Sequence, residues 1–150
     1  MASKLEVEVE VKSSAEKIWE SMRSFSTLFP KAFPDVYQSV EILEGDGKSV
    51  GSTRLIKYSP GLALISTTTE KIESVDEEKK TLSYTIIDGD MLKFYSSFKA
   101  TISVAPKGDG TVVKFVSEFN KASEEVPEPD LFKDFVVKNF QDLDAYLLKA

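Results

Sequence analysis

Residues 5–12 of this 150-residue chain read LEVEVEVK, a strict alternation of apolar and acidic side chains. A period of two predicts a β-strand, because successive side chains of a strand point to opposite faces. The apolar set, Leu5, Val7, Val9 and Val11, is expected to lie on one buried face, with the glutamates in water. The chain therefore opens with a half-buried strand.

Two short helices are predicted directly after this strand. Ser13 and Glu16 have the spacing of a capping box, in which the Ser13 hydroxyl caps the first helix and Glu16 reaches back, and apolar residues follow at helical spacing up to Met22. A second helical pattern covers residues 25–33 and is expected to be interrupted at Pro30, because proline is poorly tolerated inside a helix.

A run of strands joined by turn residues comes next. The strands are predicted near residues 36–44, 51–58, 63–75, 81–88, 92–105 and 111–121. Their short connections imply antiparallel hairpins, so the sheet counts seven strands with the first one. Residues 130–148 then form a long helix of roughly 28 Å, enough to cross a small sheet. The order predicts an α+β fold in one domain, residues 1–150, whose antiparallel sheet grips the C-terminal helix.

The composition excludes several kinds of chemistry. The chain has no His and no Cys, so it offers no Ser-His-Asp or Cys-His site, no disulfide and no Cys/His zinc site. Nineteen basic and 25 acidic side chains give a net charge of −6, without the clustered Lys/Arg that nucleic acid requires. No apolar run approaches the ~20 residues of a membrane span. We expect a soluble, cytoplasmic monomer without cofactor, metal or nucleic-acid partner.

The segment GDGKS at residues 45–49 resembles a phosphate-binding loop only superficially. Such a loop requires a glycine where this chain has Ile42, and a helix where residues 53–56 alternate like a strand. The segment is instead predicted to be a hairpin loop built on Gly45, Gly47 and Gly51, of which the last two supply backbone freedom.

Acidic residues are numerous, and five of them could in principle supply an acid–base pair. No fixed geometry links them, so a solvated face is the favoured interpretation. The five are Glu70, Glu73, Glu118, Glu124 and Glu125.

Polar residues also occur on the expected inner face of the sheet. Tyr84 alternates with apolar residues, Tyr58 lies two residues from Ile56, and residues 66–69 read STTT. Buried hydroxyls need partners, and an apolar pocket with a few polar groups is typical of a small-molecule site. The pattern fits equally well with hydroxyls that bond the backbone or face water. The ten Phe residues likewise fit a packed core or a cavity lining.

Five segments, in order, carry a resemblance to a known family. They are the opening VEVEVKS strand, LEGDG with VGS at residues 43–52, EKIESVD at 70–76, YTIIDGD at 84–90 and LDAYLL at 143–148. Together they resemble the plant Bet v I / major latex protein family, in particular its major latex protein-like members, from end to end.

The resemblance implies the helix-grip fold of the START-like superfamily, in which the sheet and the long helix enclose a hydrophobic cavity and two short helices close its far end. It also implies that the cavity binds an amphiphilic plant compound, such as a steroid, flavonoid or cytokinin, as a carrier or buffer in defence and stress responses. The positions that it places toward the cavity are Ile56, Tyr58, Ile65, Thr67, Leu82, Tyr84, Ile86, Phe98, Ala100, Ile102, Phe132, Phe135, Val136 and Phe140.

Two other functions remain open within the same superfamily. A hormone receptor would use residues 59–63, which resemble a gate loop, but residues 90–93 read DMLK in place of the receptors' His-Arg-Leu latch. An isomerase or condensing enzyme would use Tyr and Glu in the cavity. The alkaloid-forming relatives need a Lys with acidic and Tyr partners, a set that the matching positions do not supply. We therefore expect a binding protein and not an enzyme, with no catalytic residue.

Overall fold

A computed structural model describes residues 3–59, 66–123 and 130–149 of the chain. Within these residues, strands and helices follow the order predicted from the sequence. The elements are β1 (Ser3–Val11), α1 (Ala15–Arg23), α2 (Phe25–Ala32), β2 (Tyr37–Glu44), β3 (Thr53–Tyr58), β4 (Thr67–Asp76), β5 (Thr81–Gly89), the 3-10 helix η1 (Asp90–Lys93), β6 (Tyr95–Lys107), β7 (Gly110–Lys121) and α3 (Asp130–Lys149).

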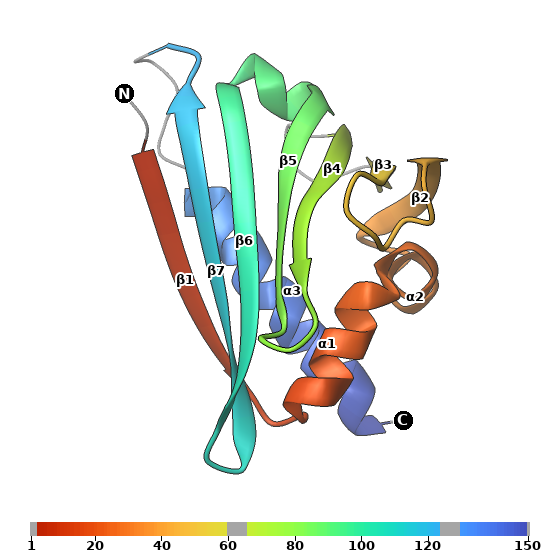
Figure 1. The fold of residues 1–150 in the computed structure, drawn as a ribbon, viewed down its shortest axis with the longest axis vertical. Helices are drawn as coiled ribbons and strands as arrows, with labels where there is room; N and C mark the ends of the chain where they lie inside the picture. The colour runs from red at the N-terminus through yellow and green to blue at the C-terminus, as the bar shows by residue number, and fades with distance from the viewer. Residues whose placement is uncertain (1–2, 60–65, 124–129, 150) are drawn as a thin grey trace.

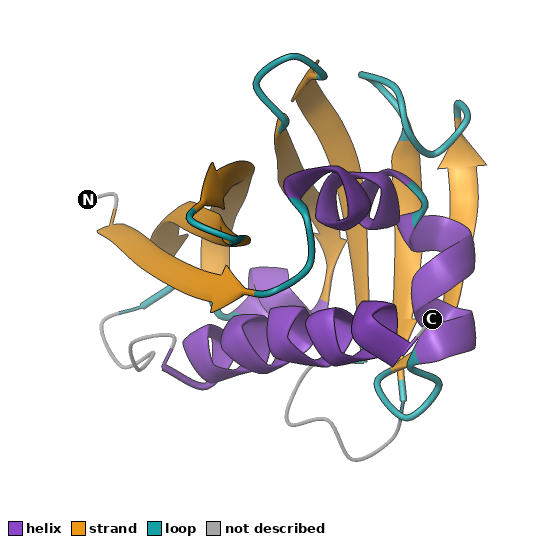
Figure 2. Cartoon of the chain, turned by 90° about the horizontal axis from the view of Figure 1, so that it is seen from below, coloured by secondary structure: helices purple, strands orange, loops and turns teal. Residues whose placement is uncertain are grey.

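All seven strands join one antiparallel sheet in the order β1-β7-β6-β5-β4-β3-β2. The sheet follows the chain except that β1 pairs with β7. Figure 1 shows α3 crossing behind the strands. Figure 2, seen from below, shows the sheet curving around α3, with α1 and α2 beside the helix. This arrangement confirms the predicted α+β helix-grip fold.

The opening alternation has the predicted effect on burial. Val7, Val9 and Val11 are buried while the intervening glutamates are exposed, and Leu5 packs partly against the core. Full burial of an aliphatic side chain contributes about 1.5–3 kcal/mol, so this short strand is a substantial part of the core. Its pairing with β7 places Val9 opposite Val113, which is also buried.

The start of α1 differs by one residue from the capping-box prediction. Ser14, not Ser13, is the N-cap, and its hydroxyl accepts a hydrogen bond from the Lys17 amide at 3.2 Å. Ser13 instead donates its hydroxyl and its amide to the carboxylate of Asp144 on α3, at 2.7 and 2.8 Å. The adjacent serines made both choices possible, and the contact with the distant α3 decides between them.

Helix α1 is also joined to the turn between β4 and β5. The indole Nε1 of Trp19 donates to Glu77 at 2.7 Å, and Arg23 forms an ion pair with the same carboxylate at 3.0 Å. The helix is therefore held at this end of the sheet, where it faces α3.

Three predicted boundaries were wrong. Helix α2 continues through Pro30, because proline removes one backbone bond while the bond from the Phe33 amide to Phe29 persists at 2.8 Å. Strand β6 begins at Tyr95 and not at residue 92, because residues 90–93 form η1. Strand β4 begins at Thr67, so Ser66 is not part of it, and residues 63–65 of the predicted strand lie outside the described part of the chain.

The contact between α3 and the β1–α1 turn gives a first prediction. The Asp144 carboxylate accepts bonds from the Lys12 amide and from Ser13. Asp144→Ala is expected to lower the free energy of unfolding by about 1–3 kcal/mol in urea denaturation, since hydrogen bonds to a charged group are lost. The control, Asp142→Ala on the same helix, breaks only an exposed pair with Lys138 and is expected to cost under about 0.5 kcal/mol.

The same contact has a defined pH dependence. Burial alone would raise the pKa of Asp144, but the hydrogen bonds from Lys12 and Ser13 outweigh it and hold the pKa below its usual value. A lowered pKa means that the stabilisation is complete above the unfolded-state pKa of about 3.9 and disappears as the pH falls through the folded-state value. The stability difference between the parent protein and Asp144→Ala should therefore shrink only below about pH 4. A constant difference down to pH 2 would contradict this account.

Candidate functional site

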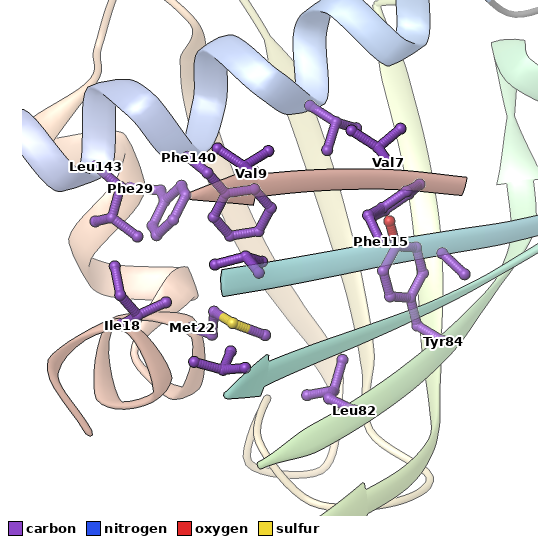
Figure 3. Close-up of a cluster of buried hydrophobic side chains, with 14 of the residues drawn as sticks. Val7, Val9, Ile18, Met22, Phe29, Leu82, Tyr84, Phe115, Phe140 and Leu143 are labelled. Atoms are coloured by element: carbon purple, nitrogen blue, oxygen red, sulfur yellow. The ribbon is translucent and has the colours of Figure 1, made fainter. Parts of the chain in front are cut away.

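A cavity of about 90 Å³, partly open to solvent, lies between the inner face of the sheet, the two short helices and α3. Of the sixteen lining residues that the structure describes, ten are apolar, three are tyrosines and three are other polar residues. Figure 3 shows part of this region, with Phe140 of α3 above the strands that carry Tyr84 and Phe115. The cavity is thus largely apolar, with a small number of polar groups.

Eight of the fourteen positions expected to face the cavity do line it. They are Ile56, Tyr58, Leu82, Tyr84, Ile102, Phe135, Val136 and Phe140. They come from β3, β5, β6 and α3, so the alternation along each strand and the apolar stripe of the helix correctly identified the surfaces that meet. Ile65 lies outside the described residues, and Phe132 is on α3 without a described side chain.

Four expected positions do not line the cavity. Ile86, Phe98 and Ala100 are buried in the core and share the inner face with lining residues of β5 and β6. Phe98 packs in an aromatic cluster, where its ring stacks on that of Phe119 with the ring centroids 6.1 Å apart. The single methyl group of Ala100 gives it little reach toward the cavity.

The fourth is Thr67. On β4 the side chains that face the cavity are one residue away from the expected positions. Thr67 lies opposite Lys57, whereas Thr68 lies opposite the cavity residue Ile56. Thr68 is buried, and its hydroxyl lies 3.5 Å from that of Tyr58. Thr68 therefore holds the inward position that was assigned to Thr67.

An ion pair forms the polar part of the cavity wall. Arg54 and Glu70 lie directly opposite each other on β3 and β4, and Arg54 Nη2 donates to Glu70 Oε1 at 2.7 Å. Only 5% of Arg54 and 6% of Glu70 is exposed. The guanidinium also lies 4.9 Å from the ring centre of Phe25, within cation–π range. The expectation that Glu70 belongs to a solvated face was therefore wrong.

The pair has unused hydrogen-bonding capacity. Arg54 Nε is buried without a hydrogen-bond partner, and a buried unsatisfied donor costs about 1–3 kcal/mol. Burial raises the pKa of Glu70, although the neighbouring Arg54 charge offsets part of this effect. Two opposite charges thus lie on the cavity wall, held by one hydrogen bond between them.

Three tyrosines accompany this pair. Burial raises the pKa of Tyr37, Tyr58 and Tyr84, and the nearby charge of Glu70 raises each of them further. All three therefore keep neutral hydroxyls at physiological pH. Tyr37 donates its hydroxyl to Asn139 Oδ1 on α3 at 2.8 Å, which ties β2 to the helix across the cavity.

Eight lining residues were not among the expected positions. They are Met22, Phe25, Phe29, Tyr37, Arg54, Glu70, Phe115 and Asn139. Arg54 had a detectable signal, because it precedes Ile56 and Tyr58 on β3 at a spacing of two. The residues of α1 and α2 had an indirect signal, because the family resemblance places two short helices at the end of the cavity. Tyr37 of β2 had none, because only the three-dimensional arrangement brings it to the cavity.

The glycine-containing loop between β2 and β3 is filled by its own side chains. Gly45 and Gly47 adopt φ angles of 76° and 79°, which glycine tolerates best. The Asp46 carboxylate accepts hydrogen bonds from the amides of Ser49 and Lys48 at 2.7 and 2.8 Å, and these bonds lower its pKa. The amides that would contact a phosphate are therefore already bonded to Asp46, in agreement with the hairpin interpretation.

The segment compared with a receptor gate cannot be placed. Of residues 59–63, only Ser59 lies in the described part of the chain, where its hydroxyl donates to the Pro34 carbonyl at 2.7 Å. Within the described part of the chain, no helix is both long enough and apolar enough to cross a membrane.

The Arg54–Glu70 pair gives a second prediction. Arg54→Met leaves Glu70 buried without its counter-charge and is expected to cost about 3–5 kcal/mol in urea denaturation. Arg54→Met with Glu70→Leu removes both charges and is expected to be as stable as the parent or up to about 4 kcal/mol more stable. A double variant less stable than Arg54→Met alone would contradict the burial of the pair.

Comparisons with known proteins agree with this geometry. The chain matches the family model of the "Pathogenesis-related protein Bet v 1 family" over residues 1–150. MLP-like protein 423 of Arabidopsis thaliana is 50% identical over 145 residues, which cover 97% of this chain and 94% of that protein.

Two solved structures have a similar fold. Ginseng major latex-like protein 151 from Panax ginseng superposes with a TM-score of 0.86 at 24% identity, over 97% of both chains. Norcoclaurine synthase from Thalictrum flavum, in complex with dopamine and hydroxybenzaldehyde, superposes with a TM-score of 0.82 at 26% identity, over 99% of this chain and 88% of that one. With its helix-grip fold and these relatives, the chain belongs to the Bet v 1 / major latex protein family.

Proposed function

We propose that the protein binds a small amphiphilic plant metabolite in the internal cavity and acts as its carrier or buffer in defence or stress responses. The observation that carries this proposal is the composition of the described cavity wall, which is mainly apolar and carries the buried Arg54–Glu70 pair together with Asn139 and three tyrosine hydroxyls. Such a wall suits a ligand with an apolar body and one polar end. Membership of a family with a ligand-binding fold supports the same function.

The size of the cavity limits the ligand. At about 90 Å³ it is smaller than the roughly 300–1,000 Å³ of typical small-molecule sites, and smaller than the ~150 Å³ apolar cavity that admits benzene. A steroid or flavonoid would require the wall to open. Five of the described lining residues are only half-buried, so these are the positions at which the wall borders solvent: Phe25, Tyr58, Ile102, Phe135 and Asn139.

The driving force is burial of the ligand's apolar body. Each Å² of apolar surface removed from water contributes about 25 cal/mol, reduced by the cost of association and by any opening of the wall. The aromatic residues supply a rigid surface for this body. The rings of Tyr58 and Phe135 have centroids 6.1 Å apart, and those of Tyr37 and Tyr58 5.7 Å.

A cavity-filling variant tests this proposal. Ile102 lines the cavity from β6, and Ile102→Phe is expected to weaken the binding of steroid, flavonoid and cytokinin-type ligands at least about tenfold in calorimetric titration, because the larger ring occupies their space. The matched control is Thr101→Phe, one residue away on the opposite face of the strand, which should leave affinity unchanged. Equal affinity in both variants, or no binding by the parent protein, would contradict the proposal.

Enzymatic activity is a second candidate, favoured by one feature of the cavity. Glu70 with a raised pKa lies close to Tyr58 and Tyr84, and such carboxyl–hydroxyl groups can serve acid–base chemistry. The norcoclaurine synthase structure contains dopamine and hydroxybenzaldehyde.

Incubation with these two compounds and product detection by mass spectrometry tests this candidate. An enzyme should lose turnover in Tyr84→Phe while ligand binding persists. The binding function predicts no turnover above buffer in the parent protein.

A further inference from the structure

The Arg54–Glu70 pair is a charge-neutral unit with separate donor and acceptor sides. A guanidinium only donates hydrogen bonds, and an ionised carboxylate only accepts them. The one bond between Arg54 Nη2 and Glu70 Oε1 leaves capacity on both partners, and Arg54 Nε is buried without any partner. Both side chains line the cavity and are more than nine-tenths buried.

We propose, resting on the proposed binding function, that this pair selects ligands whose polar end is neutral and both accepts and donates hydrogen bonds, and that Glu70 rejects carboxylates. An amide, or a carbonyl beside a hydroxyl or amine, accepts from Arg54 and donates to Glu70. A carboxylate satisfies only the arginine and brings a second negative charge beside Glu70.

Burial makes this selection strong. Charges on a desolvated wall are screened much less than charges on the surface, so a second anion beside Glu70 is strongly disfavoured. The positive charge of Arg54 does not compensate for this, since Glu70 already neutralises it at 2.7 Å. The tyrosines around the pair are neutral hydroxyls and leave its charge balance unchanged.

Among the described cavity-lining residues, Arg54 and Glu70 are the charged ones. Charge discrimination by the ligand site therefore depends on these two positions. Removing the charge of Glu70 alone leaves a buried cation and should reverse the preference.

The test uses three ligands with the same ring: benzamide and benzoate, which differ in their polar end, and toluene, which has none. Each is larger than benzene, so its entry requires the wall to open. Their dissociation constants are measured at pH 7.5 by following backbone amide shifts in NMR titrations. The parent protein is expected to bind benzamide at least about tenfold more tightly than benzoate, which corresponds to about 1.4 kcal/mol. Toluene, without a polar end, reports binding to the apolar part of the cavity alone.

Two single variants with the same change of charge distinguish an effect of the cavity residue from an effect of the protein's net charge. Glu70→Gln keeps the shape of the side chain and is expected to invert the preference, so that benzoate binds more tightly than benzamide. Glu73→Gln alters an exposed glutamate of the same strand and should leave the parent preference unchanged. If Glu70→Gln is too unstable to study, Arg54→Met with Glu70→Leu provides the test: benzamide should lose its advantage over toluene while toluene binding persists.

The outcomes distinguish this proposal from the function on which it rests. Stronger binding of benzoate by the parent protein, or an unchanged preference in Glu70→Gln, overturns the selection rule even where toluene and larger amphiphiles bind. The rule also fails if larger amphiphiles bind and none of the three probes does. Failure of toluene and of every amphiphile to bind overturns both the rule and the proposed binding function.

Discussion

The buried ion pair between Arg54 and Glu70 is the interaction on which the character of the cavity depends. It places two charges on a largely apolar and aromatic wall. Arg54 on β3 and Glu70 on β4 are directly opposite each other in the pairing of these two strands. Burial of a single charge is costly, so each residue requires the other. Burial, together with the charge of Glu70, raises the pKa of the hydroxyls of Tyr58 and Tyr84 and keeps them neutral, although Arg54 acts in the opposite direction. A wall of pure hydrocarbon would hold an apolar ligand but could not orient its polar end.

The fold provides this wall by curving one sheet around one helix. Two contacts, at the middle of α3 and nearer its C-terminal end, hold the helix against the sheet. Asp144 bonds the turn between β1 and α1, and Asn139, which lines the cavity, accepts a hydrogen bond from Tyr37 on β2. Because β1 and β2 are the two edge strands, these contacts connect this part of the helix to both edges of the sheet.

Much of the fold was predictable because its signals are local. The period of two in residues 5–12, the turn residues between strands and the apolar stripe of the last helix each depend on a few neighbouring positions. The phase of β4 was not predictable, because residues 66–69 are all hydroxyl-bearing and carry no alternation that marks the inner face. The role of Ser13 was also hidden, since its partner Asp144 is 131 residues away.

The site was predictable only in its apolar part. Charged residues on a strand normally indicate a solvated face, so Glu70 gave no sign of burial until its opposite neighbour was known to be Arg54. The most direct measurement of the central claim is the set of intermolecular nuclear Overhauser effects between a bound amphiphile and the protein's methyl groups. The account predicts contacts with Leu82, Ile102 and Val136, which line the cavity. Contacts confined to the exposed residues Leu43 and Val50 would contradict it.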